Sequence, residues 1–213
     1  MPSIHDPAFA PPEEPPFAPL RSPFRQKGHG YLGDFTYFDR AVPGGSVAVI
    51  AAVPSTIARA YLQQPFRGSE WYDAYPCAIM HAAAARLSHQ TLAQLRRAVG
   101  AYHAATAGVL YRALLRVVSN EAVALWAPRI ASIYFEYGKV LTVADGPSRV
   151  TGEWRGIPAS LAQFTVFAAE GFTEEMLRVA GASAPRFELA TAEPDGEKDG
   201  QPLVRIPLRI AWS

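Results

Sequence analysis

The sequence predicts an α+β fold in which an N-terminal helical layer packs on a C-terminal antiparallel sheet, with one long helix between two hairpins. Two observations support this. Up to Gly138, apolar residues recur every three to four positions, the period of helices that bury one face. From Lys139 onward, short alternating runs separated by turn residues are typical of paired strands, apart from one long apolar-faced stretch at 161–179.

The bulk composition is typical of one folded domain with a tail. The chain has 213 residues, of which 49% are hydrophobic and 18% charged, enough apolar mass for a core and too little charge for disorder. Its 20 basic and 19 acidic residues leave a formal charge of +1, without the basic excess of a nucleic-acid binder. Apolar runs are too short for a membrane span, and the N-terminus has no secretory signal pattern. We therefore expect a cytoplasmic protein that binds no nucleic acid and has no membrane span.

Cys77 is the only cysteine of the chain. A single cysteine excludes an intramolecular disulfide and a cysteine-rich zinc site, and an unpaired thiol fits a reducing compartment. Because its neighbours in sequence are apolar, we expect Cys77 to be buried as a small hydrophobic side chain.

Residues 1–27 form a proline-rich segment with eight prolines and no helical or strand period. Proline fixes φ and removes a backbone donor, so an extended arm that does not pack is expected, with a single α+β domain at 28–213. Two interpretations stay open. The arm is either a solvated tail or a docking arm that fills grooves on a protein partner with its large apolar side chains. Those side chains are Phe9, Phe17, Leu20 and Phe24.

Turn and cap signals divide residues 28–138 into several elements. They predict turns at Gly33-Asp34 and Pro43-Gly44-Gly45 around a short element at 35–38. They also predict helices at 46–52, at 56–62, at 76–87, from Ser88 past an interruption at Gly108 to Val117, and from Ser119 to Tyr137 with a kink at Pro128.

The last third of the chain predicts the sheet and its long helix. A hairpin at 140–154 turns at Asp145-Gly146-Pro147, and Ser160 is expected to cap a helix that ends at Gly181. Strands at 187–190 and 203–212 would flank a polar loop at 193–200. Pro207 lacks a backbone donor, so it favours a sheet edge or a bulge.

Three features resemble a known family: the Ser69-Glu70-Trp71-Tyr72 step into a helix, the Leu110-Tyr111-Arg112-Ala113-Leu114-Leu115-Arg116 stretch, and the closing strand–helix–strand order. Over residues 28–213 the chain resembles a myxobacterial paralogous family of unknown function, which is similar to α+β domains of the 4-vinyl-reductase and heme-NO-binding type. The resemblance implies small-molecule sensing or protein binding more than catalysis. Related 4-vinyl-reductase domains often carry cysteines around the last hairpin, whereas this chain has none near Val204, which argues against metal binding there.

His103 is the candidate heme ligand, since the resemblance implies an iron ligand on a helix ahead of the sheet. The Tyr-x-Ser-x-Arg clamp that the same family uses for heme propionates is not found in order after it; Arg129, Ser132 and Tyr134 stand nearby in a different order. The remaining histidines (His5, His29, His81 and His89) lack the spacing of metal ligands. We therefore expect no metal and no cofactor, with heme bound through His103 as the alternative.

Aromatic residues offer a candidate pocket between the helices and the sheet. One wall would come from a cluster at a helix entrance, which alternatively only seals the two layers against each other. The facing wall would include an arginine that either pairs with an acidic ligand or is solvated. The candidates are Trp71, Tyr72, Tyr75, Trp126, Arg129 and Tyr134.

No catalytic constellation is present in the sequence. It has no G-x-S-x-G elbow, no P-loop lysine after Gly44-Gly45-Ser46, and no paired carboxylates on one helix face. The first hypothesis is therefore a non-catalytic regulatory or scaffolding module that binds a partner protein, with a small apolar ligand in its core and self-association left open. The alternative is a small-molecule or heme-based sensor, and an enzyme of unrecognised type ranks below both.

Overall fold

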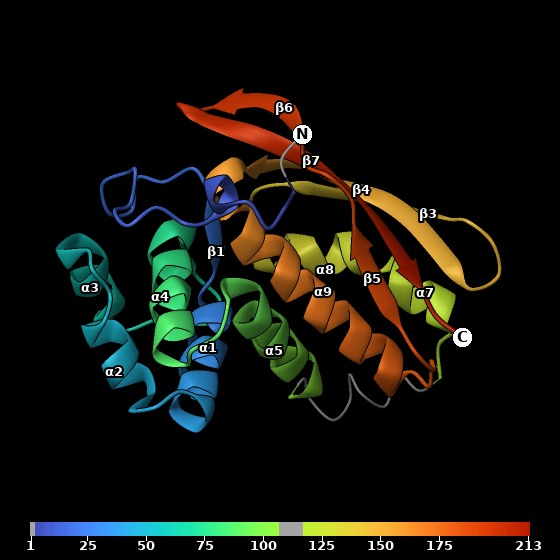
Figure 1. The fold of residues 1–213 in the computed structure, drawn as a ribbon, viewed down its shortest axis with the longest axis horizontal. Helices are drawn as coiled ribbons and strands as arrows, with labels where there is room; N and C mark the ends of the chain where they lie inside the picture. The colour runs from blue at the N-terminus through green and yellow to red at the C-terminus, as the bar shows by residue number, and fades with distance from the viewer. Residues whose placement is uncertain (1–2, 107–116) are drawn as a thin grey trace.

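A computed structural model describes residues 3–106 and 117–213, and it confirms the α+β class (Figure 1). The helices of the first half form one layer and the strands of the second half form a five-stranded sheet. Helix α9 (Ala162–Val179) lies between them and contacts both α5 (Leu92–Ala105) and strand β5 (Arg186–Leu189). The other helices are α1 (Gly28–Ala41), α2 (Gly45–Ala51), α3 (Thr56–Leu62), α4 (Ala74–Leu87), α7 (Asn120–Leu125) and α8 (Ala127–Tyr134), with short 3₁₀ turns η1 (Pro7–Phe9) and η2 (Ala159–Leu161).

Helix starts follow local capping chemistry at two of the predicted positions. Ser55 Oγ accepts a hydrogen bond from the Ala58 backbone N at 3.0 Å, and Ser119 Oγ accepts one from Ala122 N at 3.1 Å. Each satisfies a backbone donor that the first helical turn leaves free. The predicted starts of α3 and α7 are therefore confirmed.

Two other predicted caps are wrong. Helix α5 is capped by Thr91, which forms a reciprocal capping box with Gln94, and Ser88 instead is the C-cap of α4. Ser160 lies in η2, where its hydroxyl is 3.2 Å from Tyr75 Oη, and it makes no cap for α9. For α5, the capping box of Thr91 and Gln94 lies three residues after Ser88 and competes with it. For α9, the Ser160 hydroxyl is engaged by Tyr75 from another part of the chain.

The predicted turn at Gly33-Asp34 is also wrong, because both residues lie inside α1. The burial of Tyr31 and Phe38 on this helix, both 0% exposed, overrides the local turn signal. At Pro128 the chain has two helices, α7 and α8, instead of one kinked helix, with the proline in the first turn of α8. The continuation of the predicted helix through 107–116, including the Leu110–Arg116 motif, lies outside the described residues.

The five-stranded sheet is antiparallel with the order β3-β4-β7-β5, and β6 also pairs with β7. The predicted hairpin is confirmed as β3 (Lys139–Ala144) and β4 (Arg149–Pro158), with Val140 opposite Trp154. The stretch predicted as a polar loop forms strand β6 (Glu193–Lys198), which is a correction. A separate two-stranded sheet joins β1 (Arg25–Lys27) to β2 (Trp71–Asp73), which was not predicted.

Pro207 lies within the central strand β7 (Gln201–Ala211), not at an edge. On one side of β7, the β6 pairing covers residues up to Arg205 and the β5 pairing begins at Leu208. The proline therefore falls where β5 ends: Ala190 N still donates to the Pro207 oxygen at 2.9 Å, but the return bond that an N–H would make is missing.

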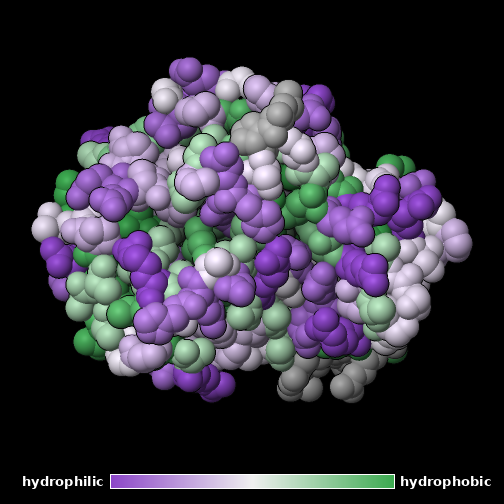
Figure 2. Space-filling model, in the orientation of Figure 1, coloured by the Kyte–Doolittle hydropathy of each residue, from purple (hydrophilic) through white to green (hydrophobic). Residues whose placement is uncertain are grey.

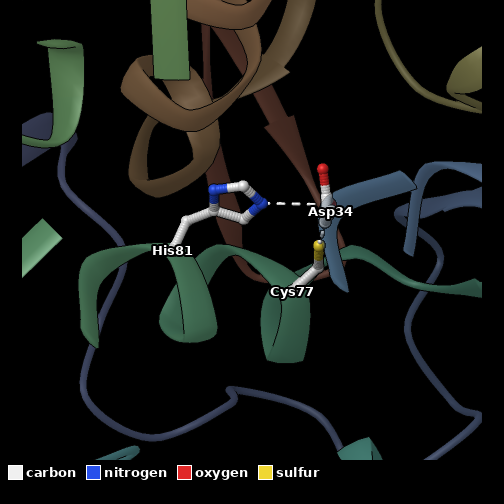
Figure 3. Close-up of side chains that lie close together, drawn as sticks. All are labelled: Asp34, Cys77 and His81. Carbon is white, nitrogen blue, oxygen red and sulfur yellow. Dashed lines mark hydrogen bonds and ion pairs between the residues drawn. The ribbon is translucent and has the colours of Figure 1, made fainter. Parts of the chain in front are cut away.

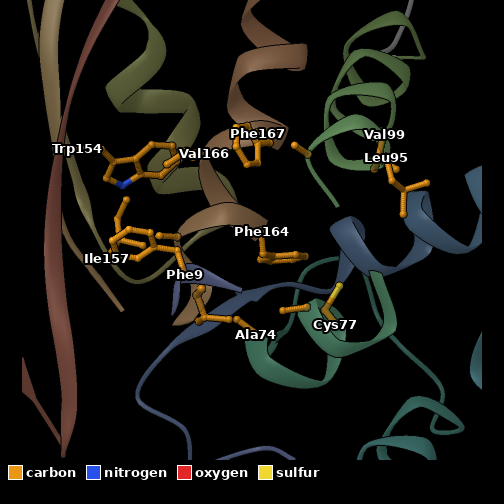
Figure 4. Packing of buried hydrophobic residues seen from close by; sticks show 14 of the residues in the cluster. Phe9, Ala74, Cys77, Leu95, Val99, Trp154, Ile157, Phe164, Val166 and Phe167 are labelled. Atoms are coloured by element: carbon orange, nitrogen blue, oxygen red, sulfur yellow. The ribbon is translucent and has the colours of Figure 1, made fainter. Parts of the chain in front are cut away.

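The N-terminal segment packs on the domain, so the expectation that it does not pack is wrong. Ile4, Phe9 and Phe24 are 4%, 5% and 0% exposed, and Phe9 lies among the core residues in Figure 4. Gln163 Nε2 donates to the backbone oxygens of Ile4 and Asp6 at 3.0 and 2.9 Å. These contacts fix the segment on helix α9.

The large apolar side chains of this segment mostly face their own domain. Phe17 is partly buried and its ring centroid lies 5.9 Å from that of Tyr75, whereas Leu20 is 66% exposed. Docking of a partner by this arm stays a prediction. Of its four proposed contact residues, Leu20 presents the most exposed side chain.

The surface has no extended apolar band on the face that Figure 2 shows, where hydrophilic and hydrophobic residues are interspersed. Within 3–106 and 117–213, no helix has both the length and the apolar character needed to cross a bilayer.

Helices α5 and α9 approach each other through glycine. A Cβ on Gly100 would collide with the backbone oxygen of Ala168, and a Cβ on Gly171 would collide with the backbone oxygen of Arg97. The absence of a side chain at both positions lets the two backbones touch. This close approach packs α5 of the helical layer directly against α9.

Gly100→Ala is expected to lower the free energy of unfolding by about 3 kcal/mol, because the methyl group forces two backbones apart. Gly30→Ala in α1 is the matched control, since the nearest atom to its Cβ is 4.0 Å away. That control should be neutral or stabilising by up to about 1 kcal/mol, because alanine favours helix. Urea denaturation of both variants measures the difference, and equal stabilities would contradict the role of this contact.

Candidate ligand-binding site

A buried polar cluster centred on Asp34 lies between α1, α4 and α5 (Figure 3). Asp34 Oδ2 is 3.0 Å from His81 Nε2 and accepts a hydrogen bond from Cys77 Sγ at 3.2 Å. Asp34 Oδ1 lies 3.1 Å from His103 Nε2 and 4.0 Å from Arg96 Nη1. One carboxylate therefore meets four side chains from two other helices.

The cluster places the Asp34 carboxylate beside the Arg96 guanidinium and two imidazoles. Burial alone would raise the pKa of Asp34, but His81 and His103 hold it well below its usual range. Burial, followed by the charge of Arg96, lowers the pKa of His81 to about 4, so this imidazole is neutral at pH 7. Burial also raises the pKa of the Cys77 thiol well above its usual value. At neutral pH the Asp34 carboxylate is thus balanced by the Arg96 guanidinium.

Both His81 ring nitrogens have polar neighbours. Nε2 lies 3.0 Å from Asp34 Oδ2 and 2.9 Å from Arg96 Nη1, and Nδ1 lies 3.3 Å from the same Nη1. Arg96 Nε donates to the backbone oxygen of Phe164 at 2.8 Å, and the guanidinium stacks 3.9 Å from the Phe164 ring centroid. Helices α1, α4, α5 and α9 are joined by this network.

Three possible metal-ligand atoms of the cluster, from Asp34, Cys77 and His81, lie within 4.8 Å of one another. The Arg96 guanidinium occupies the same region, with Nη1 2.9 Å from His81 Nε2. A cation bound there would meet a fixed positive charge and would have to displace these hydrogen bonds. We therefore assign no metal to this cluster.

A cavity of about 80 Å³ lies beside the cluster, between the helical layer and the sheet. Its polar end is formed by side chains of the cluster and by Gln26 of β1, and the rest of its wall is mainly apolar. The wall comes from α1, α5, α8 and α9 and from strands of the sheet. Its lining residues include Gln26, Asp34, Arg96, Val99, His103, Ile130, Ala131, Tyr134, Phe135, Val140, Trp154, Ala169, Phe172, Phe187 and Leu208.

Of the six predicted pocket residues, the structure places Tyr134 in the cavity wall. Tyr72 and Tyr75 are buried elsewhere, at 5% and 1% exposure. Trp71 is half-buried under Lys27, whose Nζ lies 3.9 Å from the ring centroid. Arg129 is exposed, and Trp126 is a partly buried residue packed against the core. The cavity that the structure contains is therefore built largely from other residues.

Sequence reasoning missed Asp34, Arg96 and Gln26 and treated His81 and His103 separately. A usable signal was present, because Cys77 and His81 are four residues apart and Arg96 and His103 are seven apart. These spacings place each pair on one helix face. Cys77 is buried, as expected, and it also donates to Asp34.

Solved structures of H-NOX domains share this fold. A Cs H-NOX mutant and an H-NOX structure that probes heme distortion each superpose with a TM-score of 0.63 at 13% identity, covering 88% of this chain and 96% and 95% of theirs. An oxygen-binding H-NOX domain related to soluble guanylate cyclases gives a TM-score of 0.61 at 13% identity, covering 88% of this chain and 95% of its own. No family model and no curated protein matches the chain.

These neighbours confirm the heme-NO-binding part of the resemblance at the level of the fold. The likeness to a myxobacterial family and to 4-vinyl-reductase domains stays a prediction. The neighbours contradict the expected partner-binding scaffold and the expected lack of a cofactor, because the structures with this fold are heme domains. They support the alternative hypothesis of a small-molecule or heme-based sensor.

The residues of this chain do not fit a porphyrin in the described arrangement. His103 is the histidine of the described cavity wall, but its Nε2 lies 3.1 Å from Asp34 Oδ1, so an iron bound at that nitrogen would have to displace the carboxylate. The cavity of about 80 Å³ is also far below the roughly 300–1,000 Å³ of pockets for larger ligands. Among the described lining residues, Arg96 alone carries a guanidinium or ammonium group, and it is bonded to Phe164.

Proposed function

We propose that this chain is a small-molecule sensor domain whose ligand occupies the cavity between α5, α8, α9 and the sheet. The observation that carries the proposal is a mainly apolar cavity at the junction of two layers, in a fold whose solved neighbours are heme domains. The proposal includes no catalytic step and makes the cavity the functional centre.

The position of the cavity suits a sensor. Its wall draws Val99 and His103 from the helical layer and Val140 and Leu208 from the sheet. A ligand that contacts both layers stabilises the arrangement that binds it best and shifts the population toward that arrangement. The signal would therefore be a change in how the helices sit on the sheet.

A thermal-unfolding screen of the full chain tests this function with hemin, phenol, benzyl alcohol and indole as probes. At least one probe should raise the melting temperature saturably by several degrees, because a ligand that binds only the folded state stabilises it. The same probe should fail with Ala131→Phe, in which a phenyl ring on α8 takes the space of the cavity. Hemin binding would in addition be visible as a Soret absorption band.

The matched control is Ala60→Phe, the same substitution at an exposed position of α3. This variant should respond to the probes like the wild type. If no probe distinguishes the wild type from Ala131→Phe, the cavity is not a ligand site and the proposed function is wrong.

A further inference from the structure

The polar end of the cavity holds hydrogen-bonding atoms that have no partner among the described residues. Gln26 Nε2, Asp34 Oδ1 and His103 Nε2 are all buried and make no hydrogen bond. Gln26 and Asp34 are 4% and 2% exposed, and the His103 side chain is 13% exposed. Asp34 Oδ1 and His103 Nε2 approach to 3.1 Å without the alignment of a hydrogen bond. Gln26 Nε2 therefore has no hydrogen-bond partner at the cavity wall, and Asp34 Oδ1 and His103 Nε2 face only each other.

This clustering is unusual because buried polar groups in folded proteins are nearly always paired. Leaving a buried polar atom unpaired costs about 1–3 kcal/mol, so a ligand group that pairs with Gln26 Nε2 and Asp34 Oδ1 would be stabilised in the cavity. Trp154 Nε1 is also unpaired, but it packs against Gly138 and belongs to the sheet side of the wall. We therefore count Gln26, Asp34 and His103 as the polar end.

The charged groups at the polar end of the cavity indicate whether the ligand is charged or neutral. Asp34 Oδ1 already faces His103 Nε2 at 3.1 Å and the Arg96 guanidinium at 4.0 Å, so the protein itself supplies the counter-charge of this carboxylate. A cationic or anionic ligand would leave a net charge in a buried, low-dielectric site, which is costly. A neutral ligand keeps the balance.

The polar end of the cavity offers one hydrogen-bond acceptor and one donor, and this pair indicates which polar group the ligand carries. Asp34 Oδ1 can only accept a hydrogen bond, whereas Gln26 Nε2 can only donate one. A hydroxyl group donates and accepts through a single oxygen, so it satisfies both with the smallest volume. In Figure 3 one carboxylate oxygen of Asp34 points away from the Cys77 sulfur; this is Oδ1, which lies 3.1 Å from His103 Nε2 and has a second lone pair for a further donor.

The volume of the cavity and the apolar part of its wall indicate the size and the apolar character of the rest of the ligand. About 80 Å³ exceeds the roughly 10–15 Å³ that one water needs, and it is of the order of a single ring. Beyond the polar end the wall is made of side chains such as Val99, Ile130, Phe172 and Leu208. An apolar ring is stabilised there by removal of its surface from water.

We propose that the cavity binds a neutral, single-ring molecule with a hydroxyl group, such as a phenol, whose hydroxyl donates to Asp34 Oδ1 and accepts from Gln26 Nε2. This inference rests on the proposed sensor function and names its ligand class. It differs from the porphyrin of the fold neighbours in size and in the role of His103, which stays beside Asp34.

Calorimetric titration of the full chain with phenol and with toluene tests the ligand class. The two probes have nearly the same size, but only phenol can hydrogen-bond to the polar end. Phenol should bind saturably and at least about tenfold more tightly than toluene, the factor that one hydrogen bond of about 1.4 kcal/mol supplies. Ala131→Phe should abolish phenol binding, and Ala60→Phe should leave it unchanged.

A second variant tests the contact itself. Gln26→Leu removes the donor while keeping the side-chain size, and it should reduce the tenfold preference for phenol over toluene. Equal binding of both probes to the wild type would show that the polar end is served by water, and it would overturn the ligand class. Binding of neither, together with saturable binding of hemin or indole that Ala131→Phe abolishes, would also overturn the class but leave the sensor function standing. Failure of every probe would overturn both.

Discussion

Asp34→Ala is expected to lower the free energy of unfolding by about 3–5 kcal/mol, the cost of leaving a buried charge without its partner. Asp34 is 2% exposed and Arg96 is 4% exposed. Removing the carboxylate leaves the Arg96 guanidinium unbalanced and deprives Cys77 and His81 of their acceptor. Because the cluster joins α1 to α4 and α5, the loss should affect the whole helical layer.

Urea denaturation followed by circular dichroism measures this loss. The matched control is Asp145→Ala, which removes the same side chain from an exposed ion pair with Arg149, where both side chains are nearly half exposed. Solvent screens that pair, so the control should cost no more than about 1 kcal/mol. Equal costs for the two variants would show that Asp34 is not a principal charge partner in the core.

The elements that the sequence predicts correctly are those set by local chemistry. Ser55 and Ser119 cap helices because their hydroxyls reach backbone donors three residues on. The β3–β4 hairpin follows from a turn sequence at 145–147 between alternating runs. In each case the residues that decide the structure are neighbours in the chain, so no knowledge of tertiary packing is needed.

The candidate site could not be predicted in the same way. Asp34 resembles a turn residue after Gly33, and only burial against α4 and α5 makes it the centre of a network. Its partners Cys77 and Arg96 come from separate helices, and no short motif joins them. The cavity depends further on how α8 sits against the sheet. Helix spacing could have paired Cys77 with His81 and Arg96 with His103, but not the two pairs with each other.

A fall in pH from about 6.5 to 4 should destabilise the protein through His81. Burial, then the neighbouring Arg96 charge, lowers the pKa of His81 to about 4, whereas an unfolded histidine has a pKa near 6.5. Between these values the unfolded state binds a proton that the folded state does not, so stability is full above pH 6.5 and falls as pH decreases. A difference of about 2.5 pKa units corresponds to about 3 kcal/mol.

The other groups that face His81 do not reverse this sign. Asp34 attracts a proton to the imidazole, but its effect is already included in the lowered pKa of His81. The pKa of Asp34 itself is lowered, so its own contribution is lost only below about pH 3.9. His29 also has a lowered pKa, first from desolvation and then from the nearby His103 and Lys27, and adds a loss in the same direction. The His81 window therefore lies above that of Asp34.

Urea denaturation at several pH values between about 4 and 7 separates His81 from the other histidines. His81→Gln keeps an amide that can donate to Asp34 but has no group that titrates in this range, so its stability should vary much less with pH than that of the wild type. His89→Gln, at an exposed position, should retain the wild-type slope. If His81→Gln and the wild type lose the same stability on acidification, the proton that destabilises the domain binds to another group. The assignment of His81 as neutral at pH 7 would then be wrong.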